Sequence, residues 1–145
     1  MNARVATVLT GSIILLLGLA ALFYPERAMG VLGFAIPATE RGNSVLGEVR
    51  ATYGGIFVVM GVYTLLATAD PWAHRARLLF IGLMWLGACA GRLLGVYLDG
   101  NPGIFGWLGV VFELAIGGTL VAASQAHAPE EALVARVPAP PIEAQ

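Results

Sequence analysis

Four long apolar runs alternate along the chain with short polar stretches. The runs cover about residues 5–24, 45–69, 78–98 and 104–124. Because an α-helix rises about 1.5 Å per residue, a run of about 20 apolar residues crosses the hydrocarbon core of a bilayer. The first run is longer than the apolar core of a signal peptide, so we expect a membrane span there. The pattern therefore predicts an all-α fold, a polytopic membrane protein whose four transmembrane helices form a bundle with short loops.

The polar stretches set the limits of these helices. Asp70 and Pro71 follow the second run, and proline cannot continue a helix. Residues 99–103 hold two glycines, an asparagine and a proline, which predicts a tight turn and an antiparallel hairpin of the third and fourth helices. Residues 26–44 form the longest connection, and we expect it to lie on the bilayer surface. Residues 1–125 then form one transmembrane domain, and residues 126–145, rich in Ala, Pro and Glu, form a flexible tail.

The composition agrees with lipid as the surrounding solvent. Of the 145 residues, 58% are hydrophobic and 12% are charged, about half the charged fraction of soluble domains. The net charge of −1 offers no basic field for phosphates, so nucleic acid is not an expected partner. One cysteine and two histidines occur, in no metal-ligand spacing, so neither a metal nor a nucleotide is an expected cofactor.

The arginines in the short loops predict how the helices are oriented. Arg4, Arg75 and Arg77 lie on one face of the membrane, whereas Arg27 and Arg41 lie on the other. Positively charged residues are enriched in cytoplasmic loops. We therefore expect a multi-pass protein of the bacterial cytoplasmic (inner) membrane, with its N- and C-termini in the cytoplasm.

Four charged residues lie within or near the predicted spans, namely Glu48, Arg50, Arg92 and Glu113. An ionised side chain at the centre of a membrane helix costs about 2.5 to 3.5 kcal/mol, so such residues need partners. Counted from the helix ends, all four lie in the half of the bundle nearer to the outer face, and their formal charges cancel. We expect a polar cluster into which Glu48 faces, while Arg50, with Tyr53 on its side, turns toward a neighbouring helix or the headgroups.

Glycines accompany these charges, and several of them are spaced four residues apart. They are Gly55, Gly87, Gly91, Gly95, Gly109 and Gly117. Glycines allow helix backbones to approach closely, and they also leave room for a ligand. The polar cluster therefore has two interpretations: a ligand-binding site, or a staple that only holds the bundle together.

The motif E-x-R-A-x-Y-G-G occupies residues 48–55 and is followed by G-R-L at residues 91–93 and E-L at residues 113–114. This set resembles a family of small bacterial four-helix membrane proteins described as a domain of unknown function, and the resemblance covers about residues 5–124. It implies that Glu48, Arg50, Tyr53, Arg92 and Glu113 form a shared polar site, and it supplies no reaction. The layout is also similar to that of the DoxX-like membrane proteins, some of which are associated with quinone or redox systems.

The sequence holds no Gly-rich dinucleotide loop, no cysteine pair and no Ser/His/Asp set. We therefore expect a non-catalytic protein: an accessory or assembly subunit, or a binder of a lipid-like or quinone-like molecule through the Arg/Glu cluster. The alternatives are a small proton-linked transporter that uses Glu113 and a membrane enzyme of the DoxX-like type. The expected partners are membrane lipids together with another membrane protein or a second copy of the chain.

Overall fold

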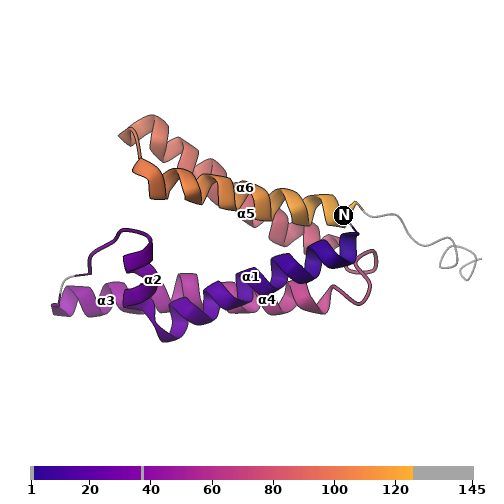
Figure 1. The fold of residues 1–145 in the computed structure, drawn as a ribbon, viewed down its shortest axis with the longest axis horizontal. Coiled ribbons are helices and arrows are strands. Elements are labelled where there is room, and N and C mark those ends of the chain that lie inside the picture. The colour runs from indigo at the N-terminus through magenta and orange to yellow at the C-terminus, as the bar shows by residue number, and fades with distance from the viewer. Residues whose placement is uncertain (1, 37, 126–145) are drawn as a thin grey trace, which may run out of the picture.

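The computed structural model describes residues 2–36 and 38–125, which form helices joined by short connections (Figure 1). The helices are α1 (Ala3–Phe23), α2 (Pro25–Val31), α3 (Glu40–Val49), η1 (Arg50–Ile56), α4 (Phe57–Leu66), α5 (Arg75–Asp99) and α6 (Gly103–Ser124). The element η1 is a π-helix, and the backbone stays helical where it joins α3 and α4. We refer to the continuous rod of α3, η1 and α4 as helix two.

Four helices are long and apolar enough to cross a membrane, which confirms the predicted fold class. They cover Ala3–Phe23, Gly42–Leu66, Arg75–Asp99 and Gly103–Ser124, so the predicted ends shift by at most three residues. Helix two ends at Leu66, before Asp70 and Pro71. After Leu66 the backbone hydrogen bonds join residues three apart, as in a turn, and no longer four apart as in an α-helix. The predicted tail, residues 126–145, lies outside the described residues.

The stretch between the first two predicted spans, about residues 25–44, is partly helical. It contains the short helix α2 and the first turn of α3. Pro25 occupies the first position of α2, where an N–H group has no partner within a helix, so the missing N–H of proline costs nothing. Met29 of α2 is buried against Ala21 of α1 and Val49 of α3. The connection therefore packs back onto the bundle.

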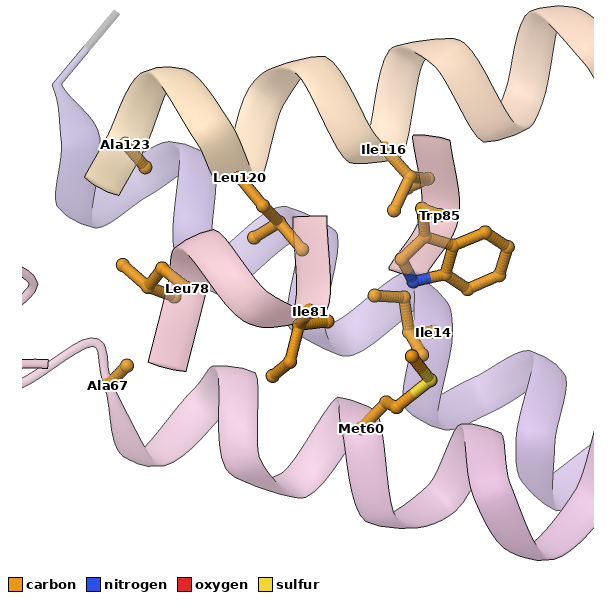
Figure 2. Close-up of a cluster of buried hydrophobic side chains, with 9 residues drawn as sticks. All are labelled: Ile14, Met60, Ala67, Leu78, Ile81, Trp85, Ile116, Leu120 and Ala123. Carbon is orange, nitrogen blue, oxygen red and sulfur yellow. The ribbon is translucent and has the colours of Figure 1, made fainter. Parts of the chain in front are cut away.

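The helices form two pairs, α1 with helix two and α5 with α6. Figure 1 shows the pairs close together near the N-terminus and the α4–α5 connection, and farther apart toward the α5–α6 turn. The main core lies where the pairs meet, through contacts of α1 with α6 and of α4 with α5. There, Ile14, Met60, Trp85 and Ile116 come from four different helices (Figure 2).

The contact between α1 and helix two brings two backbones together at glycines. A Cβ atom on Gly61 would lie 2.5 Å from the backbone nitrogen of Leu15, and one on Gly18 would lie 2.6 Å from that of Val58. No side chain fits at these distances, so close helix packing here requires glycine. The glycines of this contact are Gly11, Gly18, Gly54 and Gly61. None of them was among the predicted packing glycines.

The predicted tight turn joins α5 to α6. Gly100 and Gly103 have φ angles of 97° and 71°, which side chains other than glycine rarely adopt. Between them, the Asn101 side-chain oxygen accepts hydrogen bonds from the Gly103 backbone N–H at 3.1 Å and from the Trp107 indole N–H at 3.2 Å. This turn fixes how α5 and α6 align, and hence which of their side chains face each other.

Candidate functional site

Arg92 on α5 and Glu113 on α6 form an ion pair across the helix hairpin. The Nε of Arg92 donates to the two carboxylate oxygens of Glu113 at 3.2 and 3.1 Å, and Nη2 donates to Oε1 at 2.6 Å. The Glu113 side chain is 8% exposed and that of Arg92 is 38% exposed. Hydrogen bonds between charged groups offset part of the cost of placing two charges among apolar side chains. The structure thus brings these two predicted residues together.

Gly109 makes room for the guanidinium group of this pair. It lies one turn before Glu113 on α6, and therefore on the same helix face. A Cβ atom on Gly109 would lie 2.9 Å from both Cζ and Nε of Arg92. The Arg92 guanidinium group therefore lies directly against the α6 backbone at Gly109, within hydrogen-bonding distance of the Glu113 carboxylate.

A series of contacts between aromatic rings joins helix two to α5 and α6. The Tyr53 and Phe57 rings of helix two lie 5.8 Å apart between centroids, and Phe57 lies 4.8 Å from Trp85 on α5. Trp85 in turn lies 5.5 Å from Phe112 on α6. Ring pairs at such distances attract one another beyond the effect of burial alone. The rings therefore connect helix two to the α5–α6 pair.

A cavity of about 420 Å³ lies between the helix pairs, beside the ion pair. Helix two contributes Thr52, Tyr53, Ile56, Phe57 and Met60, while α5 and α6 contribute Met84, Trp85, Ala88, Arg92 and Glu113. Apolar and aromatic side chains therefore make up most of the wall, and the polar groups are few. This volume lies within the range of small-molecule pockets, which also have mostly apolar walls with a few polar groups.

The side chain of Trp85 lines this cavity, whereas its indole nitrogen is buried in the apolar core. Trp85 is 4% exposed, and its Nε1 has no hydrogen-bond partner among the described residues. Figure 2 shows the ring within the core formed where the helix pairs meet. A buried donor without a partner costs about 1–3 kcal/mol. Sequence reasoning missed Trp85, although its position seven residues before Arg92 places both on one helix face.

Glu48 and Arg50 lie outside the cavity, which corrects the prediction that Glu48 faces into the polar cluster, whereas Arg50 was expected to turn away from it. Both are exposed, and in the part of the chain that the structure describes neither forms a hydrogen bond or ion pair with Arg92 or Glu113. Thr52 is the first residue of helix two that lines the cavity, and Glu48 lies one turn before it, so the cavity ends before Glu48. Tyr53, within η1, does line the cavity.

Only some of the predicted glycines contact another helix. A Cβ atom on Gly117 would lie 2.8 Å from Leu86 on α5, and Gly109 contacts Arg92. By contrast, a Cβ atom on Gly87 or Gly91 would meet no described atom within 4 Å. Gly55 and Gly95 likewise have neighbours only within their own helices. The prediction that Gly87, Gly91 and Gly95 pack against another helix was therefore wrong for contacts within the described chain.

The fold and the site together define a class: multi-pass helical membrane proteins with a polar and aromatic cavity between two helix pairs. Residues 2–124 match the sequence model of a family described as a domain of unknown function, DUF4345, and the chain belongs to this family. The match covers nearly the whole described chain. Neither a curated protein nor a solved structure matches it.

Proposed function

We propose that this protein binds a neutral, membrane-dissolved amphiphile in the cavity between its helix pairs. The observation that carries this proposal is the cavity itself, which has a largely apolar and aromatic wall and lies beside the buried Arg92–Glu113 ion pair. The polar head of the amphiphile would meet Arg92 and Tyr53, and its apolar part would extend along helix two and into the bilayer. On the orientation predicted from the arginines, the site belongs to the outer half of a bacterial inner-membrane protein.

The charges of the site favour a neutral ligand. Arg92 and Glu113 already balance each other, and Arg92 donates to both carboxylate oxygens. A ligand with a net charge would therefore stay unpaired among apolar side chains, which is costly. A phospholipid phosphate fits this environment less well than an uncharged polar group.

The hydrogen-bonding groups of the site favour a ligand with acceptors. The bonds to Glu113 use Nε and Nη2 of Arg92, which leaves Nη1 to donate. Tyr53 also lines the cavity, and its hydroxyl group can donate a hydrogen bond. A quinone ring has carbonyl acceptors on a flat apolar frame, so it suits both these donors and the surrounding aromatic rings.

The role that follows is accessory rather than catalytic: the protein holds the amphiphile for a membrane-protein partner. The proton-linked transporter has less support, because both oxygens of Glu113 accept hydrogen bonds from Arg92. A transport cycle that protonates Glu113 would have to break the ion pair with Arg92 in every cycle. A membrane enzyme of the DoxX-like type would need a reactive group beyond those described for the cavity.

A pair of alanine substitutions on α5 tests amphiphile binding. Ala88 lines the cavity and Ala90 does not, although both are exposed within the described chain. We expect Ala88→Trp to fill the cavity and to remove most of the neutral amphiphile that native mass spectrometry detects on protein extracted in polymer nanodiscs. Ala90→Trp should retain it at the wild-type level.

Thermal midpoints of the two variants control for folding, since neither new ring is aimed at a packed interface. Equal retention of the amphiphile by both variants would contradict the proposed site. Wild-type protein that carries no neutral amphiphile at all would contradict the proposed function.

A further inference from the structure

Two arginines at the α4–α5 connection are stacked on aromatic rings. The Cζ atom of Arg75 lies 5.5 Å from the centroid of the Trp72 ring, and that of Arg77 lies 5.0 Å from the centroid of the Tyr63 ring. Tyr63 belongs to the last turns of α4, and both arginines belong to the first turn of α5. A ring under a guanidinium group restrains its plane and leaves its N–H edges free to donate. The connection therefore presents two oriented cationic groups.

The charges around this connection are not balanced. Figure 1 shows the N-terminus beside it, which brings Arg4 to the same end of the molecule. Asp70 is the acidic residue of this end among those described, and its Oδ1 accepts a hydrogen bond from the Ala73 backbone N–H at 3.0 Å. In the described chain, neither Arg75 nor Arg77 forms an ion pair with a carboxylate. Among the residues that the structure describes, this end thus carries an excess of positive charge.

The opposite end of the molecule offers a direct comparison. There, Arg27 lies over the ring of Tyr24, with its Cζ atom 5.7 Å from the ring centroid. Glu26 is its neighbour in the chain, and Glu48 and Asp99 are exposed toward the same end. Stacking alone is therefore common to both ends, whereas uncompensated positive charge distinguishes the α4–α5 connection.

The two stacked arginines lie at the edge of membrane-spanning segments. The spans end at Leu66 and begin again at Arg75, so this connection lies at the level of the lipid headgroups. Lipid phosphates lie at that depth, and guanidinium groups bind phosphate through several hydrogen bonds. A zwitterionic lipid balances its phosphate with its own ammonium group, whereas an anionic lipid leaves a negative charge that the arginines can neutralise.

We propose that the α4–α5 connection is a binding site for the headgroup of an anionic phospholipid, held by Arg75 and Arg77. This site is separate from the cavity and stands independently of the function proposed for it. Its ligand is charged, whereas the cavity favours a neutral one. Each arginine near a membrane surface strengthens binding of anionic lipid by about five-fold.

The test uses the full chain in nanodiscs of phosphatidylcholine with a minor fraction of phosphatidylglycerol. Native mass spectrometry measures how strongly phosphatidylglycerol is enriched among the lipids that remain bound after the nanodisc is removed. We expect enrichment on the wild-type protein and a loss of about five-fold or more in Arg75→Gln/Arg77→Gln. Arg27→Gln is the matched control, an arginine also stacked on tyrosine but at the other end, and it should retain the enrichment.

A second variant separates the stacked geometry from charge alone. Tyr63→Leu retains both arginines and removes the ring beneath Arg77, so it should lose part of the enrichment. Undiminished enrichment in Arg75→Gln/Arg77→Gln, or an equal loss in Arg27→Gln, would overturn the site. Undiminished enrichment in Tyr63→Leu would overturn the part played by stacking. Thermal midpoints verify that each variant is folded.

Discussion

Replacing Arg92 with leucine while Glu113 is retained is expected to lower the free energy of unfolding by about 3 kcal/mol. The Glu113 side chain is 8% exposed, and its hydrogen bonds come from Arg92, so the substitution leaves a buried carboxylate without a partner. Glu113→Leu should also destabilise the protein, but by less, because the longer and more exposed Arg92 side chain can turn toward the membrane surface. Unfolding of the purified protein in detergent measures both losses.

The double variant Arg92→Leu/Glu113→Leu should be less impaired than the sum of the single variants. Apolar side chains of similar size often replace a buried ion pair without loss of stability. Glu48→Leu serves as the control, because Glu48 is exposed and lies outside the cavity. Losses that are simply additive would show that the two side chains do not interact. A double variant as stable as the wild type would indicate that the pair is kept for binding rather than for stability.

Adding a single methyl group at Gly61 should lower the free energy of unfolding by about 1–3 kcal/mol. The Cβ of Gly61→Ala would lie 2.5 Å from the Leu15 backbone nitrogen and 2.7 Å from its Cα, so α1 and helix two would have to move apart. A backbone atom cannot move aside as the end of a flexible side chain can. The thermal midpoint of the detergent-solubilised variant measures the loss.

Gly87→Ala is the matched control for this substitution. It makes the same chemical change within a membrane-spanning helix, but a Cβ atom there would meet no described atom within 4 Å. Its stability should equal that of the wild type or exceed it slightly, since alanine favours a helix more than glycine does. Equal losses at Gly61 and Gly87 would contradict the close contact between α1 and helix two.

The sequence predicted the ion pair because the information needed for it is local. A tight turn joins α5 to α6, so counting residues from that turn gives similar depths for Arg92 and Glu113. Two opposite charges at similar depth in adjacent antiparallel helices have few other partners. The same counting places the four spans within three residues of their ends in the structure.

The position of Glu48 could not be obtained by counting. The prediction assumed a regular α-helix through residues 48–59, whereas Arg50–Ile56 form a π-helix. A π-helix turns less per residue than an α-helix, and no simple sequence pattern marks one, so counting at α-helical spacing did not give the faces of these residues. The prediction placed Glu48 on the inward face and Tyr53 beside Arg50, whereas Tyr53 lines the cavity and Glu48 does not.

The glycines show a similar limit. Four-residue spacing identified a small-residue stripe at Gly87 and Gly91, yet no described helix lies against it. The close contact forms instead at Gly54 and Gly61, seven residues apart on helix two. Spacing reveals which residues share a face, but it does not reveal which face another helix will cover.

The most direct test of amphiphile binding is the NMR signal of the Trp85 indole N–H. Trp85→Phe assigns the signal in the ¹⁵N-labelled protein, and a short-chain ubiquinone is the added ligand. Trp107 is the internal control, because its indole already donates to Asn101. We expect the Trp85 indole signal to move upon saturation, because the Trp85 side chain lines the cavity, while the Trp107 signal stays unchanged. A Trp85 signal that stays in place while the quinone enters the micelle would contradict it.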